Sequence, residues 1–441
     1  MSSWTETVMW WHVYPLGFTG APIRPTGEER DGGVVHRLSR IEGWLDHLVD
    51  LGLNGLLLGP VFASTTHGYD TTDHFRIDPR LGDDDDVDRL IAAARGRGIR
   101  VLLDGVFNHV GREHPAFRAL ETHGPEADTA ELFRVRWDGW SPGAPVDADV
   151  FEGHDALVAL NHASSAVEDF VVDVMTHWLN RGIDGWRLDA AYAVPPQFWA
   201  RVLPRVRATH PDAWFVGEVI HGDAASIVRE STMDSLTQYE LWQGIWHAIS
   251  DGNLFELAHA IERNNEMLAV YAPQTFVGNH DVTRIASAIG VDRVPLALAV
   301  LFTVAGVPSV YAGDEYGYEA VKEERLGGDD AVRPEFPDAP PSPEALSASA
   351  ERILRTHQQL IALRRQHPWL HRAHTDAVHL ENTSMVLRTA TGTDAVITAL
   401  NLGDGPVTVP VADARRVVAG AARLIGAEAE IPAGGFAVFS S

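Results

Sequence analysis

The sequence contains no cysteine, so disulfide bonds, a thiolate nucleophile and cysteine-ligated zinc are excluded. This absence fits a reducing compartment, and with no secretory signal at the N-terminus we expect a cytoplasmic protein. No apolar run reaches 18 residues, which predicts no membrane-spanning helix and no membrane partner. Basic residues are scarce as well: 35 Lys and Arg against 61 Asp and Glu give a net charge of −26. Such a surface repels nucleic acid, so the charge favours a neutral ligand.

Short apolar segments alternate with amphipathic helical patterns over the first 370 of the 441 residues. Continuous apolar runs of this length are typical of buried parallel strands. Eight strands joined by helices predict an α/β fold of the (β/α)8 TIM-barrel type, with a doubly wound open sheet as the structural alternative. We expect these strands near residues 9–15, 53–59, 99–106, 183–189, 213–219, 233–237, 274–279 and 307–312.

Two segments depart from the alternating pattern. Residues 110–160 are too long for a plain strand-to-helix loop and predict a small inserted subdomain. From residue 373 to 441 the pattern changes to strands separated by turn residues, which predicts a C-terminal β-sandwich domain. The catalytic barrel is therefore expected to comprise residues 1–109 and 161–372.

The stretch "GWRLDAA" (185–191) places two opposite charges in an otherwise apolar strand. Because side chains two apart on a strand point to the same side, Arg187 and Asp189 are expected to share one face. An adjacent arginine favours the anionic form of a carboxyl group. We interpret the pair as a nucleophilic carboxylate kept ionised by its neighbour, with a structural ion pair as the alternative.

Other polar groups follow the predicted strands at the same end. Glu218 lies in the apolar stretch "WFVGEVI", a setting that raises the pKa of a carboxyl group and suits a general acid. "DGVFNH" (104–109) ends the third strand and "NHD" (279–281) the seventh. Each group taken alone could be a satisfied barrel residue or a solvent-facing strand end. Their convergence on one rim of a barrel predicts instead the paired carboxylates of glycoside hydrolysis.

Four segments in order resemble the signature motifs of the α-amylase family, glycoside hydrolase family 13: "DGVFNH" (104–109), "GWRLDAA" (185–191), "VGEV" (216–219) and "VGNHD" (277–281). The resemblance implies a barrel enzyme that cleaves α-glucosidic bonds with retention of configuration. It assigns Asp189 as nucleophile, Glu218 as acid and base, and Asp281 as the stabiliser of the transition state.

The resemblance also implies which side chains hold the sugar. "HGYDTTDHFRIDPRLG" (67–82) is similar to the family's loop after the second strand, whose tyrosine stacks on the bound sugar. "DDAVR" (329–333) is similar to an Asp-xxx-Arg pair after the eighth strand. Tyr192 stands where many members carry a lysine, on the leaving-group side. The implied substrate-binding residues are Tyr69, Asp70, His109, Arg187, Tyr192, His280, Asp329 and Arg333.

Within the family, the chain most resembles the cyclomaltodextrinase and neopullulanase branch. It starts almost at the first strand, so that branch's N-terminal β domain is expected to be missing, and a homodimer would need another surface. The resemblance implies maltooligosaccharides or cyclic maltose-containing oligosaccharides as substrates, such as cyclic maltosyl-maltose, with α-1,4 and optionally α-1,6 bonds.

No cofactor is required by this chemistry. The family often binds Ca²⁺ between the barrel and the inserted subdomain, which makes Asn108, Asp147 and Asp149 the candidate metal ligands. Two other functions remain open. The same carboxylates would serve an α-glucan transglycosylase or a trehalose-forming isomerase, and a barrel of this kind could also bind a sugar or a partner without catalysis.

Overall fold

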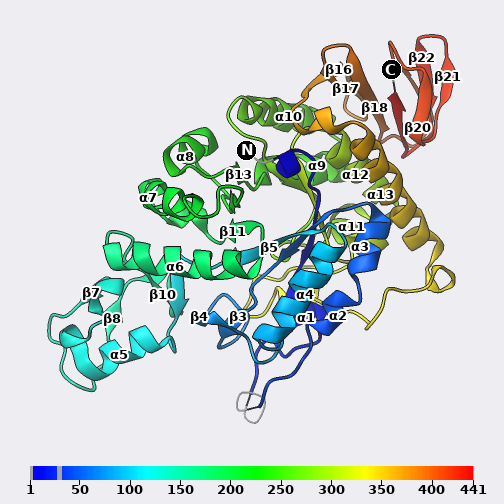
Figure 1. The fold of residues 1–441 in the computed structure, drawn as a ribbon. Coiled ribbons are helices and arrows are strands. Elements are labelled where there is room, and N and C mark those ends of the chain that lie inside the picture. The colour runs from blue at the N-terminus through cyan, green and yellow to red at the C-terminus, as the bar shows by residue number, and fades with distance from the viewer. Residues whose placement is uncertain (1–2, 27–31, 441) are drawn as a thin grey trace.

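The protein was analysed as a computed structural model that describes residues 3–26 and 32–440. Figure 1 shows a central barrel with the inserted segment (cyan) and the C-terminal strands (orange to red) on opposite sides of it. Among the described residues, no helix is both long enough and apolar enough to cross a bilayer.

The barrel is closed. Its eight parallel strands follow the order β13-β12-β11-β5-β2-β1-β15-β14, and a parallel bridge between Thr237 and Gln274 joins the two ends of this series. The closure confirms the predicted (β/α)8 barrel and excludes the open doubly wound sheet. All eight strands lie inside the ranges predicted for them: β1 (Trp10–Val13), β2 (Gly55–Leu58), β5 (Arg100–Gly105), β11 (Gly185–Leu188), β12 (Trp214–Gly217), β13 (Ser235–Leu236), β14 (Gln274–Phe276) and β15 (Val307–Tyr311).

Helices surround the barrel and bury their apolar faces against it. The acidic run "DDDDVD" starts one of them: Asp83 caps the helix, and its side chain and that of Asp86 form a reciprocal capping box. The helices are α1 (Pro15–Phe18), α2 (Ser39–Glu42), α3 (Leu45–Leu51), α4 (Asp84–Gly96), α6 (Ser165–Arg181), α7 (Pro196–Arg207), α8 (Ala224–Ser231), α9 (Tyr239–Asp251), α10 (Leu254–Leu268), α11 (Ile285–Ile289), α12 (Val294–Thr303) and α13 (Ala348–Gln366).

Two small sheets lie in the inserted segment. One is antiparallel with the order β6-β10-β9, and the other pairs β7 with β8. A separate hairpin after β2 carries the loop that contains Tyr69. The bounds are β6 (His109–Gly111), α5 (Pro115–His123), β7 (Val135–Arg136), β8 (Asp147–Ala148), β9 (Val150–Phe151) and β10 (His154–Ala159), with β3 (Phe62–Ser64) and β4 (Thr71–Ile77) forming the hairpin.

The C-terminal strands form two antiparallel sheets, as predicted. The five-stranded sheet has the order β16-β17-β18-β23-β20 and the three-stranded sheet the order β19-β22-β21. Buried side chains from both sheets, including Val386, Phe439 and Ile431, share one apolar core. The strands are β16 (His374–Leu380), β17 (Ser384–Thr391), β18 (Asp394–Asn401), β19 (Val407–Pro410), β20 (Arg416–Gly420), β21 (Arg423–Ile425), β22 (Glu428–Ile431) and β23 (Phe436–Ser440).

Candidate active site

The register of three neighbouring strands brings the predicted charges together. Arg187 on β11 pairs in register with Asp104 on β5. Asp189 and Glu218 come directly after β11 and β12, and each continues the ladder by a backbone bond: Asp189 N–H donates to Gly105 (3.1 Å) and Glu218 N–H donates to Leu188 (2.9 Å). Both side chains are therefore fixed at the C-terminal rim of the barrel, where active sites of this fold are built.

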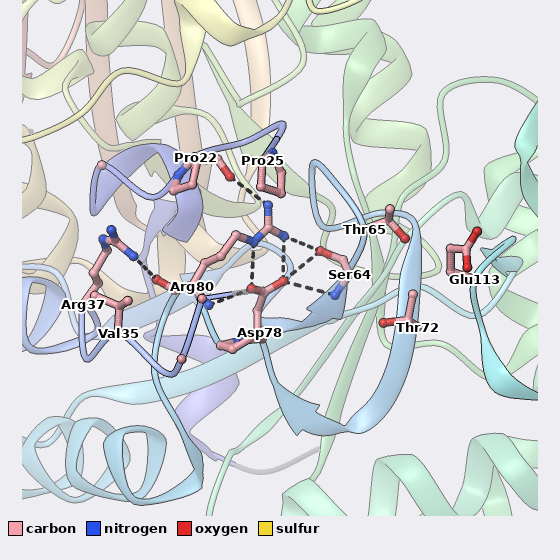
Figure 2. Close-up of a pocket in the computed structure, with 14 residues that line it drawn as sticks. Pro22, Pro25, Val35, Arg37, Ser64, Thr65, Thr72, Asp78, Arg80 and Glu113 are labelled. Carbon is pink, nitrogen blue, oxygen red and sulfur yellow. Dashed lines mark hydrogen bonds and ion pairs between the residues drawn. The ribbon is translucent and has the colours of Figure 1, made fainter. Parts of the chain in front are cut away.

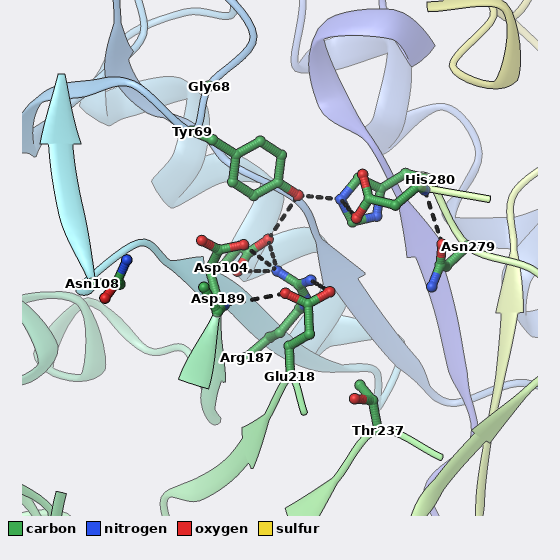
Figure 3. A network of polar contacts seen from close by, with 12 residues as sticks. Gly68, Tyr69, Asp104, Asn108, Arg187, Asp189, Glu218, Thr237, Asn279 and His280 are labelled. Carbon is green, nitrogen blue, oxygen red and sulfur yellow. Dashed lines mark hydrogen bonds and ion pairs between the residues drawn. The ribbon is translucent and has the colours of Figure 1, made fainter. Parts of the chain in front are cut away.

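Arg187 is the centre of this cluster (Figure 3). It donates to both oxygens of Asp104 at 2.6 and 2.8 Å and contacts Glu218 at 2.7 Å, whereas its distance to Asp189 is 3.3 Å. The sequence predicted that Arg187 pairs with Asp189 and keeps it ionised, and the contacts bear out only part of this prediction. One guanidinium divides its donors among three buried carboxyl groups, and Asp189 receives the longest contact.

Burial dominates the ionisation of these groups. It raises the pKa of Asp189 well above its usual range; the charge of Glu218 adds to this effect and Arg187 opposes it. Burial likewise raises the pKa of Asp104 to about 6 against the attraction of Arg187. The expectation that Arg187 makes Asp189 an easily ionised acid is therefore corrected, because desolvation outweighs one shared counter-charge.

Glu218 is surrounded by hydrogen-bond donors, not by the apolar environment that its sequence neighbours suggested. Its Oε1 accepts from Arg187 and from the hydroxyl of Tyr239 (3.1 Å), and its Oε2 accepts from the backbone N–H of Ala190 (3.1 Å). The apolar neighbours Phe215 and Val216 pack within the barrel wall and leave the strand end polar. Side chains two apart on a strand share a face, so Glu218 lies on the same side as Val216 but nearer to the rim of the barrel.

A second group of side chains holds Asp281, which lies in the segment that follows β14. Its Oδ1 accepts from Arg333 (2.6 Å) and its Oδ2 lies 3.0 Å from His280 Nε2. Arg333 also pairs with Asp329 and donates through Nε to the carbonyl of His280 (2.9 Å). The predicted Asp329–Arg333 pair thus lies beside Asp281, and part of the Asp281 side chain remains open to solvent.

Tyr69 and His109 complete the rim. The hydroxyl of Tyr69 contacts His280 and donates to Asp104 at 3.3 Å. His109 donates through Nε2 to the carbonyl of Tyr69 (3.1 Å), and its ring stacks on Phe151 at 4.8 Å. Burial lowers the pKa of His109 to about 3, so its ring is neutral near pH 7.

Two predicted binding residues are occupied by other partners. Both carboxylate oxygens of Asp70 accept from Thr66, at 3.0 and 2.7 Å, so Asp70 braces the loop that carries Tyr69. The hydroxyl of Tyr192 donates to Glu152 of the inserted segment at 2.8 Å. This contact joins the end of β11 to the hairpin between β9 and β10.

The candidate calcium ligands do not fit a metal site. Asp147 is paired with Arg136, and Asp149 is held by Arg134 and Arg136, at distances of 2.6 to 2.9 Å. Asn108 directs its amide to the ring of His109 (3.1 Å). Two carboxylates neutralised by two arginines are not the open set of oxygen donors that Ca²⁺ needs.

Tyr239 was not predicted. It is the first residue of α9, separated from the end of β13 by Thr237 and Gln238, and its hydroxyl reaches Glu218. The sixth strand is only two residues long, so its sequence signal is weak and nothing marked the tyrosine that follows it. Asn279, which contacts the same hydroxyl at 3.0 Å, lies inside the quoted motif "VGNHD" but received no role.

A cavity of about 530 Å³ elsewhere in the protein is not lined by any of these carboxylates (Figure 2). It lies beside the β3–β4 hairpin. In its main charged pair, Arg80 donates two hydrogen bonds to Asp78, of 2.8 and 2.6 Å. Arg80 also donates to the hydroxyl of Ser64. Asp78 and Arg80 therefore neutralise each other. The rim around Arg187, where several carboxyl groups lie close together, is the stronger candidate for an active site.

The rim combines two buried carboxyl groups on adjacent strand ends, a third carboxylate held by an arginine, and neutral histidines and a tyrosine around them. The two carboxyl groups on adjacent strand ends are the pair that glycoside hydrolysis of this kind requires. The chain matches the family described as "Alpha amylase, catalytic domain" over residues 28–145 and 148–338. It therefore belongs to the α-amylase family of glycoside hydrolases.

The chain is also similar to individual proteins, both curated relatives and solved structures. The chain is 30% identical to a cyclomaltodextrinase of Geobacillus thermopakistaniensis over 92% of its own length and 71% of that protein. It spans only 60% and 57% of two other curated relatives. Two solved structures superpose with a TM-score of 0.82: a Nostoc punctiforme debranching enzyme (26% identity, 100% and 99% of the two chains) and the cyclic α-maltosyl-(1→6)-maltose hydrolase of Arthrobacter globiformis (25% identity, 100% of both chains).

Proposed function

We propose that the protein hydrolyses α-glucosidic bonds of maltooligosaccharides or cyclic maltooligosaccharides with retention of configuration. One observation carries this proposal: Arg187 contacts both Asp189 and Glu218, the two carboxyl groups at the ends of adjacent strands. Such a pair can divide the work of nucleophile and acid, because the two groups differ in their hydrogen-bond partners.

In the first step, a carboxylate oxygen of Asp189 attacks the anomeric carbon while the glycosidic C–O bond breaks. Glu218 gives its proton to the departing oxygen, so the leaving sugar is released as a neutral alcohol. In the second step, Glu218 removes a proton from water, and the resulting oxygen displaces Asp189 from the sugar. Glu218 is then protonated again and Asp189 is ionised, which restores the starting state.

Asp281 stabilises the positively charged transition state through the sugar hydroxyls. Its orientation is supported by bonds to Arg333 and His280, and its partial exposure leaves an oxygen accessible to a ligand. Tyr69 offers an aromatic face, and the neutral rings of His109 and His280 border the same sugar site. Asp329 and Arg333 hold the same sugar at the cleavage site.

The names of similar proteins support the substrate class. They include a cyclomaltodextrinase, a debranching enzyme and a cyclic α-maltosyl-(1→6)-maltose hydrolase. We therefore propose that the substrates contain α-1,4 or α-1,6 bonds and are either linear or cyclic. Tyr192, which bonds to Glu152 on the inserted hairpin, lies next to Glu218 and is assigned to the leaving-group side.

A substrate panel tests this proposal. The protein is incubated with linear, branched and cyclic α-glucans, and NMR follows the anomeric configuration of the first product. We expect α-configured products from at least one class and a loss of several orders of magnitude in Asp189→Ala with an unchanged circular dichroism spectrum. β-configured first products would exclude the covalent mechanism. No cleavage of any substrate would favour a non-catalytic sugar- or partner-binding barrel.

The same experiment separates hydrolysis from transfer. If a second sugar instead of water releases the intermediate, longer oligosaccharides or trehalose accumulate, as expected of a transglycosylase or a trehalose-forming isomerase. Mass spectrometry of the products distinguishes these outcomes, because hydrolysis in H₂¹⁸O places one heavy oxygen in each new reducing end.

We also propose a cytoplasmic location and a homodimer. The location is supported by a similar protein named intracellular maltogenic amylase in Bacillus subtilis, which is 28% identical over 72% of this chain. Cell fractionation tests the compartment. Light scattering tests the dimer: a particle near the chain mass of 48.2 kDa would contradict it.

A further inference from the structure

A line of hydrogen bonds connects Asp281 to Glu218 through two residues outside the proposed catalytic trio. Asn279 Nδ2 lies 3.0 Å from the hydroxyl of Tyr239, and that hydroxyl lies 3.1 Å from Glu218 Oε1. We propose that Tyr239 is a positioning residue that fixes which oxygen of Glu218 delivers the proton to the leaving group. This inference rests on the proposed role of Glu218 as the acid.

The direction of these bonds follows from Asn279. Its Oδ1 accepts from the backbone N–H of Asp281 at 2.8 Å, which identifies the other end of the amide as the NH₂ group. The amide therefore donates to the hydroxyl oxygen of Tyr239. The single hydroxyl hydrogen is then free to point at Glu218, and Tyr239 acts as a donor toward the carboxyl group.

The consequence concerns the two oxygens of Glu218. Oε1 accepts from two donors at once, the Tyr239 hydroxyl and Arg187 Nη2 (2.7 Å). An oxygen that receives two donors has no room for a proton of its own. Among the residues that the structure describes, Oε2 accepts only the backbone N–H of Ala190, so the transferable proton sits on Oε2. After transfer, the same donors stabilise the carboxylate that must act as base in the second step.

The surroundings of Tyr239 hold it in this position. Its ring packs edge-on against Phe276 (5.0 Å) and Trp242 (5.8 Å). Burial and the nearby carboxylates raise the pKa of Tyr239 well above its usual value, so it keeps its hydrogen over the working pH range. A rigid, permanently protonated donor suits the task of orienting a carboxyl group.

Tyr239→Phe tests the proposal with two substrates. A maltooligosaccharide needs a proton on its leaving oxygen, whereas fluoride departs from α-maltosyl fluoride without one. We expect kcat/KM for the oligosaccharide to fall roughly 10–100-fold and kcat/KM for the fluoride to change by less than about 3-fold.

Tyr311→Phe is the matched control. It removes one buried hydrogen bond in the same barrel, from the Tyr311 hydroxyl to the carbonyl of Val332 (2.9 Å), and Arg284 still donates to that carbonyl.

Asn279→Asp is a second test variant. It keeps an acceptor for the Asp281 N–H but turns the Tyr239 hydroxyl away from Glu218, so the same selective loss is expected. Equal losses on both substrates would overturn the proposal and indicate a merely structural tyrosine.

A crystal structure of Tyr239→Phe gives a readout that does not depend on activity. We expect the Glu218 carboxyl group to rotate and to lose the contact between Oε1 and Arg187 Nη2. An unchanged carboxyl group would overturn the inference. If the parent protein cleaves no α-glucan, the proposed function fails, while the position of the carboxyl group still decides whether Tyr239 orients it.

Discussion

At the scale of single residues, the buried pair of Arg187 and Asp189 is expected to set the lower pH limit of the proposed activity. As the proposed nucleophile, Asp189 must be ionised to attack, and its pKa is raised, so activity should be lost as the pH falls through that raised value. Arg187→Lys keeps the charge, but a single ammonium nitrogen replaces the two guanidinium nitrogens that divide the contacts to Asp104, Asp189 and Glu218. We expect kcat/KM to fall by about 10²–10⁴ and the acidic limb to move to higher pH, measured from pH–rate profiles.

Arg207→Lys is the control for this variant, since Arg207 pairs with Asp234 (2.8 Å) without touching the carboxyl cluster. Its acidic limb should match that of the parent protein. An Arg187→Lys limb at the parent's position would mean that the guanidinium does not influence the ionisation of Asp189.

Ala190, directly after the proposed nucleophile Asp189, has a left-handed backbone with φ of 45° and ψ of 38°. This conformation costs an alanine about 1–2 kcal/mol, and glycine avoids most of this cost while losing about 0.5–1 kcal/mol through its more flexible unfolded chain. We expect Ala190→Gly to stabilise the fold by up to about 1 kcal/mol, measured by urea denaturation. A clear destabilisation would show that the methyl group of Ala190 makes a packing contribution larger than the strain.

At the scale of elements, the start of the inserted segment lies against the loop that carries Tyr69. A Cβ atom on Gly111 of β6 would lie 2.4 Å from the carbonyl oxygen of Asp70, which is backbone and cannot rotate away. We expect Gly111→Ala to displace this loop and to lower kcat/KM about 10-fold or more, because small misplacements at a site are costly. Steady-state kinetics and thermal unfolding measure the two effects.

Gly96→Ala, at the end of α4, is the matched substitution, because a Cβ atom there meets nothing within 4 Å. It should leave kcat/KM unchanged. If Gly111→Ala behaves in the same way, the contact between β6 and the Tyr69 loop does not position the sugar-binding side chains.

The elements of the barrel could be predicted because each strand is a compact apolar run, and the polar groups that follow these runs marked the rim. The sequence could not show how one arginine is shared. Arg187 is two residues from Asp189, but its shortest contacts go to Asp104 and Glu218, which come from other strands. Tyr239 and the pairing of Asp147 with Arg136 also depend on contacts between distant segments.

Across the whole molecule, buried histidines couple stability to pH. Burial lowers the pKa of His74, His109 and His371 to about 3, against about 6.5 in an unfolded chain. Below pH 6.5 the unfolded chain therefore binds protons that the fold cannot accept, and each such histidine costs about 1.4 kcal/mol per pH unit. Asp104 and Asp314, whose pKa is raised to about 6, act in the opposite direction.

The histidines outnumber these two acids, since burial also lowers the pKa of His114, His162 and His357 to about 4. We expect the melting temperature to fall steadily between pH 6.5 and 4, measured by calorimetry in buffers of constant ionic strength. A melting temperature that stays level or rises over this range would contradict the burial of neutral histidines.

The central claim is that Asp189 forms a covalent bond to the sugar with Glu218 as its partner. Glu218→Gln treated with α-maltosyl fluoride tests it directly: the C–F bond breaks without an acid, fluoride leaves, and the missing base prevents release. Mass spectrometry of the digested protein should find one maltosyl group on the peptide that contains Asp189. An unmodified protein, or a maltosyl group on another residue, would contradict the account.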